Sequence, residues 1–173
     1  VTRLSKALKI KAISVDYRLA PEHVFPCAVD DGAAALNWAM THSDGPVLIA
    51  GDSAGGGLAL ASVLRQREQG RPMPHGVYLI SPWTDLTASG DSTKTRAKAD
   101  PMLKPDWLAA GAALYLDTTP ADTPEASPLF ADLTGFPPVF MQTGDAEILR
   151  DDSIRFAEKL EQAGIPVQCE IWD

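Results

Sequence analysis

Short apolar runs alternate with segments of helical periodicity along this chain. Mainly apolar runs occur at residues 10–15, 46–50, 77–80, 139–142 and 167–171, with Gly, Pro or charged residues close to their ends. Runs of this length and composition are typical of buried strands. The pattern therefore predicts a strand at each of these positions.

Between the runs, apolar residues recur at intervals of three and four, which predicts helices. The expected helices cover residues 2–9, 28–40, 54–70, 106–116 and 152–163. Strands that alternate with helices indicate an α/β protein with a mainly parallel sheet and helices on both faces. We expect residues 1–173 to form a single domain.

Residues 84–128 break this alternation. The segment is rich in Asp, Thr, Pro and Lys, and it contains one short helical pattern at residues 106–116. A long excursion between two strands commonly forms a lid or a pocket wall. We expect this insertion to cover a binding site.

The pentapeptide at residues 51–55 reads G-D-S-A-G and lies between a predicted strand and a predicted helix. A G-x-S-x-G sequence in this context is typical of a nucleophile elbow, in which a sharp turn exposes the serine. Gly51 and Gly55 lack a Cβ and give the turn the room that it needs. Ser53 is therefore the candidate nucleophile, and the amide of Ala54 is a candidate oxyanion donor.

Ligands of open parallel sheets bind outside the carboxyl ends of the strands. Ser53, the turn at Pro82 and the loop at residues 145–147 all follow predicted strands. This convergence supports a site at that edge of the sheet, independently of the serine motif.

Composition excludes several other classes of function. A net charge of −8 argues against nucleic acid and anionic membranes as partners, and no apolar run is long enough to span a membrane. Cys27 and Cys169 are the only cysteines, without metal-ligand spacing, which favours reduced thiols in a cytoplasmic protein. We expect neither a metal nor a cofactor.

Several segments together resemble the hormone-sensitive-lipase-like esterases of the α/β-hydrolase fold. Residues 16–23 (D-Y-R-L-A-P-E-H) are similar to the segment before the elbow of that family, and residues 51–56 to the elbow itself. Residues 81–85 (S-P-W-T-D), 144–152 and 170–173 resemble its later turn, its acid loop and its last strand. The resemblance implies a carboxylic ester hydrolase that acts through Ser53 and an acyl-enzyme on a small-molecule ester with a short to medium acyl chain.

The resemblance also provides candidates for the other site residues. Members of the family usually have D-P-L-x-D in the acid loop, and residues 147–151 match this motif with Glu147 in place of the first Asp. We therefore favour Glu147 over Asp145 as the triad acid, and we interpret Asp151 and Asp152 as helix-capping residues. Trp83, Trp107 and Tyr115 are candidates for the acyl pocket, with core packing as the alternative.

Two features of the family have no match in this sequence. An H-G-G-G oxyanion loop is absent, and His23, His42 and His75 all precede the acid loop, whereas the family order places the histidine after it. We expect the chain to lack the strand between residues 10–15 and 46–50 and to be inactive alone. A homo-oligomer or a strand-completing segment is an expected partner. The alternative function is a non-catalytic small-molecule receptor on the same scaffold, as in plant gibberellin receptors.

Overall fold

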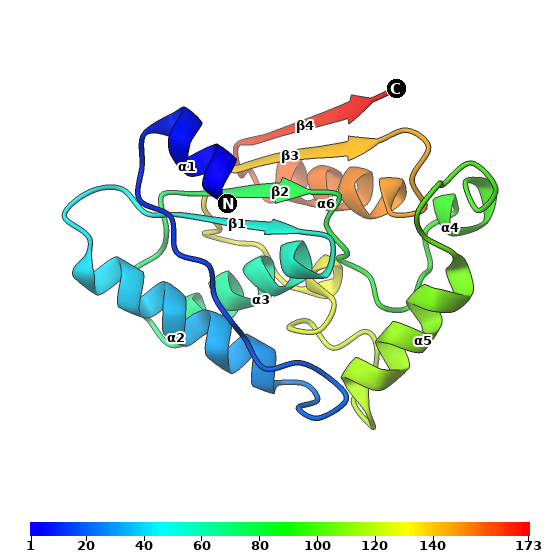
Figure 1. Ribbon diagram of the computed structural model, residues 1–173, viewed down its shortest axis with the longest axis horizontal. Helices are drawn as coiled ribbons and strands as arrows, with labels where there is room; N and C mark the ends of the chain where they lie inside the picture. The colour runs from blue at the N-terminus through cyan, green and yellow to red at the C-terminus, as the bar shows by residue number, and fades with distance from the viewer.

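A computed structural model describes all residues from Val1 to Asp173. Its centre is a four-stranded parallel sheet in the order β1-β2-β3-β4 (Figure 1). The strands are β1 (Leu48–Asp52), β2 (Gly76–Ile80), β3 (Val139–Gly144) and β4 (Val167–Trp172). In this register the four strands end at the same edge, because β1 pairs with β2, β2 with β3 and β3 with β4 in parallel.

The helices agree with the predicted ones to within a few residues. They are α1 (Thr2–Leu8), α2 (Cys27–His42), α3 (Ala54–Glu68), α5 (Pro105–Leu116) and α6 (Arg150–Gln162). The short helix α4 (Ser92–Thr95) and the 3-10 helix η1 (Pro128–Phe130) were not predicted. Both lie in or beside the insertion at residues 84–128, where short turns carry little periodic signal. No helix is long and apolar enough to cross a membrane.

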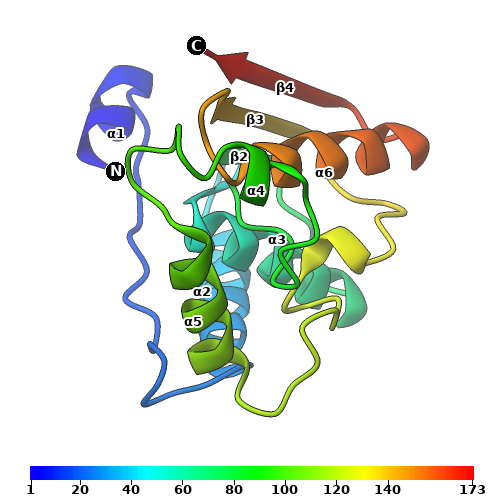
Figure 2. The same cartoon turned by 90° about the vertical axis from the view of Figure 1, so that its right-hand side faces the viewer.

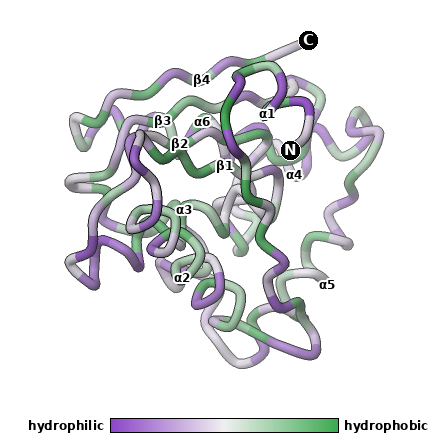
Figure 3. The backbone as a smooth tube through the Cα atoms, turned by 60° about the vertical axis from the view of Figure 1, so that its left-hand side comes forward, coloured by the Kyte–Doolittle hydropathy of each residue, from purple (hydrophilic) through white to green (hydrophobic).

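The main hydrophobic core lies between one face of the sheet and the helices. Side chains of α2, α3 and α6 pack there against alternate residues of β2 and β3; the largest include Leu60, Val63, Leu79, Met141, Phe156 and Leu160. Burying such side chains contributes roughly 1.5–3 kcal/mol each relative to exposure. Figure 3 shows the corresponding hydropathy, with β2 mainly hydrophobic and β4 alternating.

Helices were expected on both faces of the sheet, and the structure shows packed helices on only one. Helices α2, α3 and α6 all contribute side chains to one core, which contains the same alternate residues of β2 and β3. On the opposite face the rings of Tyr78 and Phe140 stack on each other with centroids 5.5 Å apart. Helix α1 forms as predicted, but none of its residues is buried, so it does not pack tightly against the sheet.

The strand expected at residues 10–15 is not formed. No residue of this stretch pairs with a strand. Its only backbone–backbone hydrogen bond outside helices and strands is from the Ile10 amide to the Ser5 carbonyl. The side chains of Ile13 and Leu48 remain 60% and 58% exposed. A strand requires a hydrogen-bonded neighbour, and no other strand lies beside this stretch, so β1 is an edge of the sheet.

Candidate active site

The carboxyl ends of three neighbouring strands bring the candidate residues to one edge of the sheet. Ser53 follows β1, Ser81 follows β2, and the loop with Asp145 and Glu147 follows β3. Figure 2 looks onto this edge, with α4 in front of β2 and α5 below the strands, in front of α2. The convergence predicted from the sequence is therefore present in the structure.

Ser53 occupies a strained backbone conformation at the elbow. Its φ is 56° and its ψ is −122°, which places a non-glycine residue in a region that costs about 1–3 kcal/mol. Backbone hydrogen bonds hold it there: the Ser53 amide donates to Ile80 O at 2.9 Å, and the Trp83 amide donates to Ser53 O at 3.0 Å. The turn after β2 thus fixes the nucleophile from two directions.

Two glycines, Gly51 and Gly57, make this close approach feasible. Gly55 was predicted to do so together with Gly51, but a Cβ on Gly55 would meet no heavy atom within 4 Å. A Cβ on Gly51 would lie 2.1 Å from the carbonyl oxygen of Gly55, and a Cβ on Gly57 would lie 2.3 Å from that of Trp83. Both neighbours are backbone atoms, which cannot shift as easily as the end of a flexible side chain. The glycines therefore allow α3 to start directly below the serine and to pack against the turn at Trp83.

Ala54 is the first residue of α3, where helix amides have no partner within the helix. It also lines the cavity beside the elbow. A helix N-terminus carries partial positive charge, so the Ala54 amide is suited to donate a hydrogen bond to an oxyanion and to stabilise its developing negative charge. The structure thus places Ala54 at the start of α3 and beside the cavity, and its role as an oxyanion donor stays a prediction.

Glu147 is turned back toward the strand ends. Its Oε1 accepts hydrogen bonds from the Ser81 hydroxyl at 2.9 Å and from the Gly144 amide at 2.7 Å. Ser81 directly follows Ile80, which holds the Ser53 amide. Both bonds use the same oxygen, so Oε2 is available to accept a hydrogen bond from an imidazole N–H.

Asp145 has a different environment. Its Oδ1 lies 3.1 Å from Arg96 Nη2 and 2.9 Å from Arg150 Nε, and the carboxylate is partly exposed. Two guanidinium groups thus already neutralise this carboxylate. The geometry supports Glu147 over Asp145 as the residue that orients a catalytic base.

A cavity of about 270 Å³ opens next to the elbow and is lined mainly by hydrophobic residues. Trp83 and Tyr115, two of the three residues predicted to form an acyl pocket, line this cavity. Trp107 does not: it lies on the outer side of α5 with 65% of its surface exposed. Helical periodicity alone does not determine which side of α5 faces the site, and that is why Trp107 was misplaced.

Sequence reasoning missed several residues of this cavity. They come from the loop before α2, from α3, from α5 and from the two ends of the insertion, and they include Tyr17, Leu19, Leu58, Leu86, Gly111 and Ala126. Most are small or aliphatic residues of types that are common in any core. Only Tyr17 and Leu19 could have been predicted, because they lie in the segment at residues 16–23 that resembles the family.

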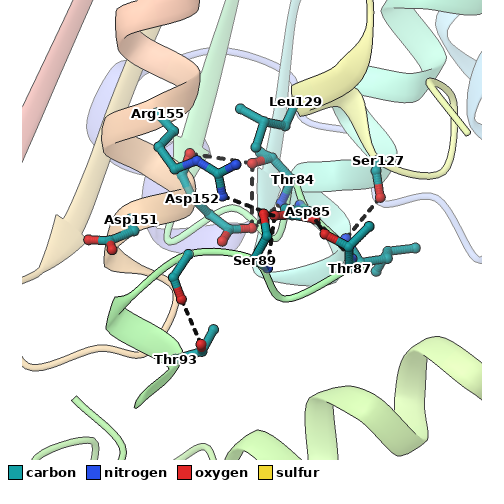
Figure 4. A network of polar contacts seen from close by, with 12 residues as sticks. Thr84, Asp85, Thr87, Ser89, Thr93, Ser127, Leu129, Asp151, Asp152 and Arg155 are labelled. Atoms are coloured by element: carbon teal, nitrogen blue, oxygen red, sulfur yellow. Dashed lines mark hydrogen bonds and ion pairs between the residues drawn. The ribbon is translucent and has the colours of Figure 1, made fainter. Parts of the chain in front are cut away.

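A buried polar network ties α6 to the turn that holds the elbow (Figure 4). Asp152 Oδ2 accepts hydrogen bonds from the amides of Thr84 at 2.7 Å and Asp85 at 2.9 Å. The carboxylate of Asp85 in turn accepts from Arg155 Nη1 at 3.0 Å. Since the preceding residue, Trp83, donates its amide to Ser53, this network supports the elbow indirectly.

The interpretation of Asp151 and Asp152 as helix caps is corrected by these contacts. No side chain caps the N-terminus of α6 by a hydrogen bond. Asp152 is buried and binds residues 84 and 85, while Asp151 Oδ2 accepts from the Ser92 amide at 2.8 Å. Their partners are about 60 residues away in the sequence, beyond the reach of a local capping rule.

Asp152 gives a prediction for the pH dependence of stability. Burial raises its pKa from 3.8 to about 7, against the opposing effect of the amides of Thr84 and Asp85. A raised pKa in the folded state means that the stability from this group is complete below about pH 4 and is lost as the pH rises through 7. Asp152→Asn keeps an oxygen acceptor but does not titrate, so the melting temperature of the variant should gain on that of the unmodified protein between pH 5 and 8.

Thermal melts of both proteins at pH 5 and pH 8 measure this effect. Asp85 stays ionised at both pH values, because hydrogen bonds from Ser89 and Thr87 hold its pKa low in spite of its burial, so its own titration does not contribute to the change between pH 5 and pH 8. A gap between the two melting temperatures that is the same at both pH values would contradict the prediction.

The parallel sheet and the strained serine between β1 and α3 define the α/β-hydrolase class. The comparison with known families agrees: the family described as α/β hydrolase fold matches residues 1–173. The chain belongs to this family, and its predicted resemblance to hormone-sensitive-lipase-like esterases is confirmed.

Individual relatives are esterases by name. An esterase of Acinetobacter venetianus is 42% identical over 99% of this chain and 58% of its own length. An acetyl-hydrolase of Streptomyces hygroscopicus is 39% identical over 98% of this chain and 57% of its own length. The 173 residues thus span a little more than half of these curated relatives.

Solved structures show the same likeness. The crystal structure of EstE5 soaked with p-nitrophenyl butyrate superposes with a TM-score of 0.96 at 48% identity, covering 100% of this chain and 59% of EstE5. A hormone-sensitive lipase from a metagenome library gives 0.95 at 43% identity, covering 99% of this chain and 60% of the lipase.

Proposed function

We propose that the whole protein is a carboxylic ester hydrolase that acts through Ser53. The observation that carries this proposal is the elbow: a serine at φ 56° between β1 and α3, with the Ala54 amide beside it. Two further observations support it. Glu147 follows β3, two strands away from β1 in the sheet, and several relatives are named esterases.

The proposed reaction has two steps. Ser53 Oγ attacks the ester carbonyl carbon while a general base takes the hydroxyl proton, and the Ala54 amide faces the oxyanion that forms. Collapse of this intermediate transfers the proton to the departing alcohol and leaves an acyl-serine. Water then attacks the acyl-serine, again assisted by the base, and releases the acid with Ser53 restored.

None of the three histidines within these residues is placed to act as that base. His75 Nδ1 accepts from the Val47 amide at 3.1 Å, at the opposite end of β1 from Ser53, and the ring of His42 stacks on Trp38. His23 lies on the exposed loop before α2. We therefore assign the base of the whole protein to a histidine outside residues 1–173, oriented by Glu147.

The substrates proposed are esters of short to medium acyl chains. A relative named an acetyl-hydrolase and the soak of EstE5 with p-nitrophenyl butyrate point to this size class. The cavity volume of about 270 Å³ agrees with small acyl groups, because it is slightly below the usual range of about 300–1,000 Å³ for small-molecule sites. A cytoplasmic location and a homo-oligomer or strand-completing partner stay predictions.

Hydrolysis of p-nitrophenyl butyrate by the whole protein tests the proposal. We expect turnover that saturates with substrate and releases p-nitrophenol without added metal. Saturable binding of the ester with no release of p-nitrophenol would instead support the receptor alternative and would contradict the proposed function.

A further inference from the structure

The cavity beside the elbow lies on one side of Ser53 only. Its walls come from residues 17–20, from the start of α3, from Trp83 and Leu86, from α5 and from Glu125 and Ala126. No residue of β3, of the loop with Glu147 or of α6 lines it. The cavity and the acid loop therefore approach the nucleophile from different sides.

The cavity has no unpaired charge. Arg18, one of its two charged lining residues, donates to both carboxylate oxygens of Asp31, with Nη2 2.8 Å from Oδ1. The other, Glu125, forms an ion pair with Arg65. Burial, above all, raises the pKa of Tyr115 to about 12, so its phenol stays neutral. An apolar chain is the ligand that such a lining accepts without leaving a charge unpaired.

The proposed reaction determines which part of the ester substrate occupies the cavity. The base that Glu147 orients must deliver a proton to the departing alcohol oxygen, so the alcohol leaves on the side of the acid loop. The acyl group then extends to the other side of Ser53, where the cavity lies. The acyl chain is therefore the occupant.

Within the cavity, Gly111 of α5 faces the indole of Trp83. A Cβ built on Gly111 would lie 3.6 Å and 3.8 Å from two ring carbons of Trp83, which is ordinary contact, and it would meet no other heavy atom within 4 Å. The space over the indole is thus open because residue 111 has no side chain. A glycine inside a helix lowers the stability of the helix by about 1 kcal/mol relative to alanine. Gly111 therefore destabilises α5 slightly and leaves the space over Trp83 open.

We propose that Gly111 is a specificity-determining residue that sets how long an acyl chain the enzyme accepts. A side chain at this position fills the cavity over Trp83 and shortens the accepted chain. The inference rests on the proposed ester hydrolase function, and it assigns the cavity to the acyl group of the substrate.

The test compares kcat/KM for p-nitrophenyl hexanoate and p-nitrophenyl acetate in the whole protein. In Gly111→Leu the ratio of hexanoate to acetate should fall about tenfold or more, because contacts with several methylene groups are lost. Gly111→Ala should show a smaller decrease. Ala113→Leu, on the exposed side of the same helix, is the matched control and should leave the ratio unchanged.

The outcomes separate this inference from the proposed function. If the unmodified protein hydrolyses neither ester, the proposed function fails and the inference fails with it. If it hydrolyses both and Gly111→Leu keeps the ratio, only the inference is overturned. A second series with acetyl esters of methyl to hexyl alcohols checks the assignment: loss of selectivity in this series alone would place the alcohol in the cavity and contradict the proposal. Melting curves of both Gly111 variants, which should not be below that of the unmodified protein, establish that they fold.

Discussion

Ser53→Ala should lower kcat/KM of the whole protein for p-nitrophenyl butyrate by about a thousandfold or more. The change removes the oxygen that forms the acyl-enzyme, and a nucleophile assisted by a base contributes several orders of magnitude. It keeps the Cβ, so the strain at φ 56° is the same in both proteins and the fold should persist. Initial rates with matched amounts of folded protein measure the loss.

A control separates this loss from a general effect of removing a hydroxyl. Ser43 is an exposed residue that follows the C-terminus of α2, far from the strand ends that carry the site. Ser43→Ala should keep the activity of the unmodified protein. An Ser53→Ala protein with near-normal turnover would refute the assignment of the elbow.

Glu147→Ala should have the second largest effect, a loss of roughly a hundredfold or more in kcat. Without its carboxylate a catalytic histidine loses its orientation and the stabilisation of its charged form. Asp145→Ala should cost less than about tenfold, because Arg96 and Arg150 already engage that carboxylate. The two variants are matched in charge, since each removes one negative charge from the same loop.

Glu147→Gln refines this comparison. The amide oxygen can keep the bonds from Ser81 and the Gly144 amide, so the loop should hold its shape while the charge is lost. We expect its kcat to fall nearly as far as in Glu147→Ala. If Asp145→Ala proves more damaging than either variant, Asp145 is the triad acid and the assignment of Glu147 is wrong.

The elbow was predictable because its determinants are local. Gly51, Ser53 and Gly55 lie within five residues, and the contact that requires glycine at position 51 is with the Gly55 carbonyl in the same turn. Gly57, whose contact is with Trp83, was not predicted. The flanking strand and helix were also set by short-range patterns. The end-of-strand positions of Ser53 and Glu147 followed from parallel topology, which needs only the order of the elements.

Features that depend on partners distant in the sequence could not be predicted from local patterns. Residues 10–15 have the alternation of a strand, but without a neighbour to pair with they stay irregular. Asp152 resembles a helix cap until its partners, Thr84 and Asp85, are seen in space. Trp107 is a residue type that is common in pockets, but the packing of α5 places its side chain on the exposed side of the helix.

The assignment of Ser53 as an activated nucleophile can be measured directly by covalent labelling. The whole protein is treated with a fluorophosphonate, digested, and its peptides are analysed by mass spectrometry. We predict one label per chain, on Ser53, and none on the Ser53→Ala protein. A label on another residue, or no label on a protein that hydrolyses p-nitrophenyl butyrate, would contradict the account.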